Sequence, residues 1–156
     1  MTFIVVRARS DVKVELSIRE TMGYMNLTRV NHAVIIPDNP QYRGMLQKAK
    51  DYITWGEADA GMVERMLTER GRMVGDAPLT DAIVAEHTDY KSISDFAKAI
   101  TAGEAQVKDI PELKRVFRLH PPRGTKGWGG IKRSFVVGGA LGSRGDAIGD
   151  LVDRMI

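Results

Sequence analysis

The chain has 156 residues, a length typical of one domain with room for an appended subdomain. It has no cysteine, which excludes disulfides, Cys-ligated zinc, iron–sulfur clusters and thiol nucleophiles. It also lacks a long apolar run and a signal-peptide layout, so we expect a cytoplasmic protein with no membrane partner. Its net charge of +3, from 23 Lys and Arg against 20 Asp and Glu, is weak support for a nucleic-acid partner.

Residues 1–57 are predicted to form a β-α-β-α-β core. Apolar runs and turn signals predict strands at 3–9, 33–36 and 51–55, with helices beginning near residues 17 and 40. Ser17 with Glu20 matches a capping box, and Pro40 suits the first turn of the second helix. We expect Arg7 and Arg9 to lie on the polar face of the first strand. The pattern favours an α+β fold with both helices on one face of the sheet.

Residues 58–112 are predicted to form an acidic helical insert. Apolar residues recur at helical spacing around 62–67, 79–83 and 93–100. Residues 51–112 hold 13 acidic against 6 basic groups. Acidic groups on amphipathic helices normally form a solvated face, so we expect this insert to face solvent or a basic neighbour and to avoid RNA.

Residues 113–156 are predicted to form a basic extension that ends in a helix. The stretch 113–145 contains eight Lys and Arg, no Asp or Glu, and many glycines. Residues 116–119 suit a short strand, and apolar side chains at 148, 151, 152 and 155 predict the closing helix. Clustered Lys and Arg displace the counterions condensed on nucleic acids, so this stretch predicts a phosphate-binding surface.

The sequence carries no recognisable catalytic or cofactor motif. The histidines at 32, 87 and 120 do not share a metal-binding spacing. Gly130 stands where a P-loop needs Lys, and Lys132 stands where a dinucleotide motif needs its third Gly. We therefore expect a protein that is not an enzyme and that holds no metal or cofactor.

The basic stretch has the composition of an RNA-binding segment. Arg and Lys bind phosphates, paired prolines stiffen the chain, and glycines let the backbone approach a sugar-phosphate ridge. Trp128 has two interpretations, stacking on an unpaired base or packing against the protein, and both stay open. The candidate RNA contacts in this stretch are Arg118, His120, Arg123, Lys126, Trp128, Lys132, Arg133 and Arg144.

Two motifs resemble one known family. Residues 37–46, PDNPQYRGML, resemble the start of the second helix in the large-subunit ribosomal protein thirty family. Residues 118–124, RLHPPRG, resemble the signature of its longer archaeal and eukaryotic members, as do Gly138, Gly139, Gly142 and Arg144 before the closing helix. The resemblance spans nearly the whole chain and is to the archaeal type, which is related to eukaryotic large-subunit protein seven.

The resemblance implies an antiparallel sheet and a structural role in the large ribosomal subunit. It also implies contacts with the large-subunit rRNA, a position near the 5S rRNA, and neighbouring large-subunit proteins as partners. Motif matching carries over Arg43, Arg118, Arg123 and the loop lysines as RNA contacts; Arg43 lies at a helix N-terminus, which favours phosphate. The candidates that rest on charge and position are Arg7, Arg9, Arg19 and Arg29.

The leading hypothesis is therefore a structural rRNA-binding protein of the large subunit. One alternative is a non-ribosomal protein-interaction module that uses the acidic helical insert. Another is an enzyme that binds a phosphorylated substrate at the glycine-rich stretch, which the failed motif checks disfavour.

Overall fold

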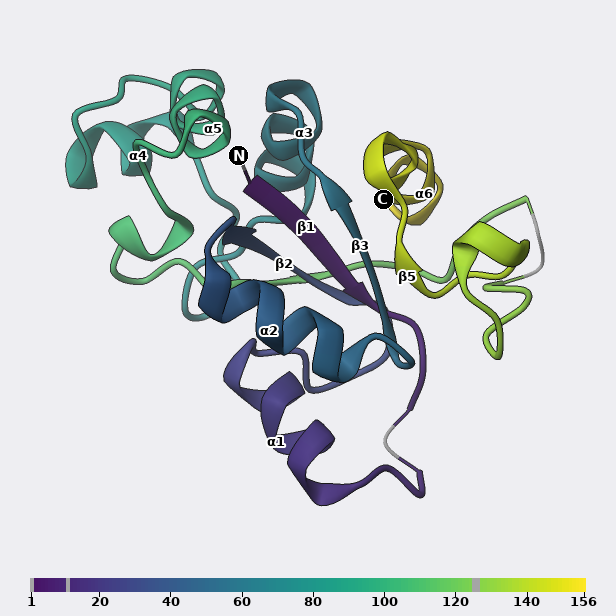
Figure 1. Cartoon of the computed structure of the whole chain (residues 1–156). Coiled ribbons are helices and arrows are strands. Elements are labelled where there is room, and N and C mark those ends of the chain that lie inside the picture. The colour runs from purple at the N-terminus through teal and green to yellow at the C-terminus, as the bar shows by residue number, and fades with distance from the viewer. Residues whose placement is uncertain (1, 11, 125–126) are drawn as a thin grey trace.

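The computed structural model describes residues 2–10, 12–124 and 127–156 and shows a five-stranded sheet with helices on both faces (Figure 1). The strands are β1 (Thr2–Arg7), β2 (His32–Pro37), β3 (Ile53–Glu57), β4 (Val116–Arg118) and β5 (Gly142–Ser143). The α-helices are α1 (Leu16–Tyr24), α2 (Pro40–Ala49), α3 (Ala60–Arg70), α4 (Asp81–His87), α5 (Ile93–Ala102) and α6 (Ile148–Met155). Three short 3-10 turns are η1 (Val107–Asp109), η2 (Phe135–Val137) and η3 (Gly145–Ala147).

The sheet confirms the predicted α+β class. Its strand order is β4-β2-β1-β3-β5, and β1 at its centre pairs antiparallel with both β2 and β3. β4 confirms the short strand predicted at 116–119, and it extends one edge of the sheet antiparallel to β2. β5 extends the other edge parallel to β3, with Thr54 opposite Gly142. The basic segment, residues 113–145, therefore contributes a strand to each edge of the sheet.

Each face of the sheet buries its own core. Phe3 and Val5 of β1 pack with α1 and α2, which confirms that these two helices share a face (Figure 1). Ile4 and Val6 point to the opposite face, where α3, α5 and α6 pack. Alternate side chains of a strand point to opposite faces, so a strand with both faces covered is buried along its whole length and is mostly apolar. This explains why all six residues of β1 are buried.

Polar side chains cap two of the helices that cover the sheet. Asn39 caps α2 by accepting a hydrogen bond from the Tyr42 backbone N–H at 2.8 Å, and Ser92 caps α5 through Asp95 at 3.2 Å. The predicted capping box of α1 is wrong. The helix begins at Leu16, so Ser17 lies inside the first turn, and its hydroxyl donates to the Glu15 carboxylate at 2.9 Å.

Three predictions for the core strands need correction. The first strand ends at Arg7 rather than at residue 9, so Arg9 lies beyond the strand. The third strand begins at Ile53 rather than 51, because the Tyr52 backbone N–H closes a turn onto the Ala49 carbonyl at 2.9 Å. Arg7 does not lie on a polar face, because α helices cover both faces of the sheet. Its side chain is 2% exposed.

β3 lies very close to the chain that leads into α6. A Cβ on Gly56 would stand 2.3 Å from the Gly145 carbonyl oxygen and 2.6 Å from the Ile148 Cβ, so only glycine fits there. The Arg144 backbone N–H donates to the Trp55 carbonyl at 2.8 Å. These contacts attach the end of the basic segment to the edge of the sheet.

Candidate nucleic-acid interface

The first part of the basic segment runs beside the C-terminal end of α6. The His120 backbone N–H donates to the Met155 carbonyl at 2.9 Å, and the Arg123 N–H donates to Arg154 at 3.1 Å. Pro122 is buried between them. The backbone is thus bound to the protein, while the side chains of Arg118, His120 and Arg123 are exposed. Three predicted RNA contacts therefore lie on the surface along one continuous stretch.

The later part folds into a compact loop, residues 130–141, that exposes Lys132 and Arg133. The Arg133 carbonyl accepts hydrogen bonds from the Ala140 and Leu141 backbone N–H groups at 3.1 and 3.2 Å. A Cβ on Gly139 would lie 2.1 Å from that carbonyl oxygen, so the two chain segments come together only because residue 139 is glycine. The loop thus presents its two cations from a hydrogen-bonded backbone.

Arg144 holds this loop against the sheet. Its Nε donates to the Thr54 hydroxyl at 2.8 Å and its Nη2 donates to the Ala140 carbonyl at 2.9 Å. The guanidinium carbon also lies 4.8 Å from the centre of the Phe135 ring, a cation–π distance. Burial, together with nearby Arg154, lowers the pKa of this guanidinium. Arg144 is half-buried, and these contacts indicate that its main role is to position the loop.

Trp128 packs against the protein. Its indole N–H donates to the Asn31 side-chain oxygen at 2.8 Å, and the ring packs against the core of α3, α5 and α6. The tryptophan is half-buried. Of its two interpretations, this geometry favours packing over base stacking. The neighbouring candidate Lys126 lies outside the described residues.

Arginines from three segments lie near His32, where β2 pairs with β4. His32 of β2 lies opposite Arg118 of β4, and Arg29 is exposed just before β2. Burial lowers the pKa of His32, and the charges of Arg29, Arg118 and Arg7 lower it further. The neutral imidazole is therefore favoured here. Local sequence patterns assign no role to His32, because strand pairing across 86 positions has no local signal.

An acidic residue from the insert reaches this cationic group. The Asp76 carboxylate accepts hydrogen bonds from the Lys114 amine at 2.7 Å and from the Arg118 guanidinium at 2.8 Å. The hydrogen bond from Lys114 is the largest cause of the lowered pKa of Asp76, and the charge of Arg118 adds to it. The insert therefore offsets part of the positive charge of the basic segment, a contact that the sequence analysis missed.

The N-terminal candidates fall into different environments. The Arg7 Nε donates to the Arg9 carbonyl and its Nη1 donates to the Leu27 carbonyl, both at 2.9 Å. Its burial gives Arg7 a place inside the protein. Arg9 is half-exposed, with its guanidinium carbon 5.1 Å from the Tyr52 ring centre. Arg19 is exposed on α1.

Arg43 lies on the first turn of α2, as its motif suggested, and its side chain is 61% exposed. The guanidinium forms a two-point ion pair with Asp38, whose second contact joins Nη2 to Oδ2 at 2.7 Å. The hydrogen bond from Arg43 lowers the pKa of the Asp38 carboxyl. Asp38 thus holds the exposed guanidinium in one orientation at the start of the helix.

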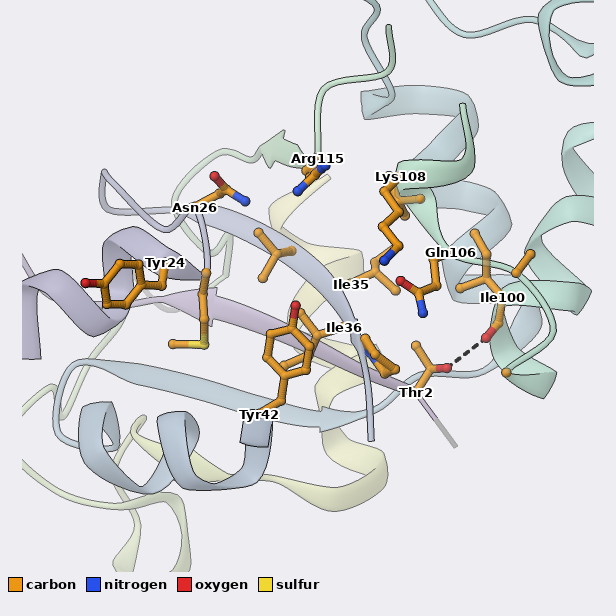
Figure 2. A pocket seen from close by; sticks show the side chains of 16 residues that line it. Thr2, Tyr24, Asn26, Ile35, Ile36, Tyr42, Ile100, Gln106, Lys108 and Arg115 are labelled. Carbon is orange, nitrogen blue, oxygen red and sulfur yellow. Dashed lines mark hydrogen bonds between the residues drawn. The ribbon is translucent and has the colours of Figure 1, made fainter. Parts of the chain in front are cut away.

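A separate cavity of about 100 Å³ lies between α1, β2, α2 and the chain from α5 to η1. Figure 2 shows Tyr42, Gln106 and Lys108 around the same hollow, with Ile35 and Ile36 of β2 among its lining residues. The lining contains neither a carboxylate nor a histidine. Such a cavity can bind a group but offers no carboxylate–histidine pair for acid–base chemistry.

The described residues contain neither a group that could hold a metal ion nor a helix that could span a membrane. In the ranges 2–10, 12–124 and 127–156, no three His, Asp or Glu side chains are grouped so that they could hold a metal ion. Over the same ranges, no helix is both long enough and apolar enough to cross a bilayer.

Comparison with known proteins gives a consistent result. Residues 3–53 match the family described as Ribosomal protein L30p/L7e. The Large ribosomal subunit protein uL30 of Methanopyrus kandleri is 51% identical over 95% of this chain and 99% of its own length. The proteins of the same name from Methanobrevibacter smithii and Methanocorpusculum labreanum are 48% and 46% identical, over 99% and 98% of this chain and 99% of each relative. The chain therefore belongs to the uL30 family of ribosomal proteins, in its archaeal form.

Proposed function

We propose that this chain binds large-subunit rRNA through its basic segment. As a uL30 protein it is a structural component of the large subunit of the cytoplasmic ribosome and not an enzyme. The observation that carries the rRNA proposal is the exposed series Arg118, Arg123, Lys132 and Arg133, on a segment with no carboxylate of its own. Their backbone is held by the protein, so little backbone conformational entropy is lost when the side chains meet phosphates.

The other candidates divide by accessibility. Arg19, Arg29, Arg43 and His120 are exposed and are proposed as further contacts. Arg7 and Arg144 are proposed to act indirectly, by fixing the backbone around the exposed cations.

The acidic insert, residues 58–112, is proposed to face away from RNA, because its charge repels phosphates. The core, 1–57, and the extension, 113–156, then share the RNA surface.

A narrower proposal concerns the position in the subunit. The family resemblance supports a place near the 5S rRNA and beside neighbouring large-subunit proteins. Crosslinking of the assembled subunit tests it directly: crosslinks from this chain to 5S rRNA support the placement, and crosslinks confined to distant rRNA contradict it. The alternative of a non-ribosomal module is not favoured, since the relatives that match nearly the whole chain are ribosomal proteins.

The rRNA proposal is tested by salt-dependent binding. Each phosphate contact is expected to add about 0.7–0.9 to the slope of log affinity against log salt. Arg123→Ala and Lys132→Ala should each lower the affinity for large-subunit rRNA and reduce that slope by about one contact. Lys98→Ala, on the exposed surface of α5, is the matched control and should change neither value. Unchanged slopes in both basic-segment variants would contradict the proposal.

A further inference from the structure

The tip of the basic segment exposes apolar side chains as well as cations. Val136 is 85% exposed, Val137 65%, Ile131 38% and Phe135 37%. These four make up half of the exposed large apolar side chains among the described residues, and they fall within seven positions. Single exposed apolar side chains are ordinary, but a local group of them marks an interaction surface. We call these four residues the apolar tip.

The fold holds the apolar tip outward. The Val137 and Gly139 backbone N–H groups donate to the Ser134 carbonyl at 3.2 and 2.8 Å, and the Phe135 N–H donates to Leu141 at 2.7 Å. Arg144 lies against the Phe135 ring and is itself bonded to Thr54 of β3. The tip is therefore attached to the sheet edge. Its valines cannot turn into the core without breaking these contacts.

The charge around the apolar tip identifies the chemistry of its partner. Lys132 and Arg133 lie within the same seven positions and are exposed. Neither pairs with a carboxylate in the described part of the chain, and residues 113–145 contain none. An apolar partner surface would leave these cations without compensation. A polyanion that also offers apolar faces satisfies both kinds of side chain.

RNA with unstacked bases has this combination of properties. In an A-form duplex the base faces are covered by stacking, and only edges, sugars and phosphates are presented. In loops and bulges the bases are splayed, and their faces accept contact from aromatic and apolar side chains. The phosphates on either side are then within reach of neighbouring Lys and Arg.

We propose that the apolar tip packs against splayed bases of a non-helical rRNA element while Lys132 and Arg133 bind the flanking phosphates. This inference rests on the proposed rRNA-binding function and narrows it, because it assigns the tip to looped or bulged RNA rather than to duplex. The side chains that carry it are Phe135, Val136 and Val137 on η2, with Ile131 at the entry to the loop.

The test uses the full-length double variant Val136→Ser, Val137→Ser and deproteinised large-subunit rRNA as the probe. Loss of the apolar contact should weaken binding by about tenfold at every salt concentration, with the salt slope unchanged, because no charge is removed. The variant Lys132→Ala, Arg133→Ala should instead reduce the slope by about 1.4–1.8. The control is Val74→Ser, which alters a valine that is 69% exposed in the acidic insert and should leave binding unchanged.

The outcomes separate this inference from the function on which it rests. If the double valine variant binds rRNA as tightly as the wild type, while the cation variant shows a reduced slope of log affinity against log salt, the apolar contact is overturned. In that case the proposed rRNA binding still stands. Normal rRNA affinity together with loss of the variant from reconstituted subunits would show that the tip binds a protein, and would also overturn it. Absence of salt-dependent rRNA binding by the wild-type chain would overturn the proposed function itself.

Discussion

The acidic insert and the basic segment differ in the burial of their apolar residues. The insert buries Val63, Met66, Leu67, Phe96 and Ile100 of α3 and α5 against one face of the sheet. The basic segment buries Phe117 and Leu141 near its two strands but exposes its apolar tip.

This difference separates a region whose folding is complete within the chain from a region that we propose binds a partner. Apolar residues at helical spacing give the insert a face that the sheet can cover, so its folding is complete within the chain. The tip has no such periodicity, and its backbone bonds keep it outward. We therefore expect substitutions in the insert to change stability and substitutions in the basic segment to change RNA binding.

The largest effect is expected for Phe96→Ala. Phe96 is fully buried in α5, beside the Tyr90 ring at a centroid distance of 6.0 Å. Its truncation removes buried apolar area and leaves a cavity, so the free energy of unfolding should fall by about 3–5 kcal/mol. Urea unfolding measures this. If the free energy of unfolding falls by less than about 1 kcal/mol, the insert does not determine stability as we expect. If the folded variant shows an altered salt slope of rRNA binding, the insert also affects RNA binding, against our account.

A smaller effect on stability is expected for Gly139→Ala, with a clear effect on binding. The added Cβ would meet the Arg133 carbonyl, so the loop must open at a cost of about 1–3 kcal/mol. Because the loop positions Lys132 and Arg133, rRNA affinity should fall. Gly44→Ala is the matched control: residue 44 lies in α2 with open space around it, and alanine there should stabilise the helix slightly.

Asp76→Asn tests the point at which the two regions meet. The change removes the carboxylate that neutralises Lys114 and Arg118, and asparagine tolerates the left-handed backbone at φ 64°. We expect rRNA affinity to rise by a few fold while the melting temperature stays nearly constant, because exposed ion pairs contribute little to stability. Weaker binding by the variant would mean that Asp76 orients Arg118 for RNA.

The smallest effect is a pH dependence from His32. Its pKa in the folded chain lies below the ordinary value of 6.5, so the unfolded chain binds the proton more readily. This contribution to stability is fully present above about pH 6.5 and is lost as the pH falls through the folded-state pKa. Melting temperatures at pH 7 and pH 5.5 should differ less for His32→Gln than for the wild type. His87→Gln, at an exposed position of α4, should retain the wild-type difference.

The sequence was sufficient for features that local patterns encode. The apolar run of β1, Pro40 at the first turn of α2, and the apolar spacing of α6 all predicted their elements. It was insufficient where distant residues meet. Trp128 donates a hydrogen bond to Asn31, 97 positions away in the sequence, and Arg144 donates one to Thr54, 90 positions away. The burial of Arg7 likewise depends on helices covering both faces of the sheet.

Lysine acetylation of the free protein and of the assembled large subunit, compared residue by residue, tests the central claim most directly. Lys132 lies in the basic segment, and Lys91 and Lys98 lie in the acidic insert; all three are exposed in the free chain. We expect assembly to protect Lys132 from acetylation and ribonuclease digestion to restore its reactivity. Lys91 and Lys98 should be acetylated to the same extent in the free protein and in the assembled subunit. Reactive Lys132 with RNA-dependent protection of Lys91 and Lys98 would contradict the claim that the basic segment, and not the insert, faces RNA.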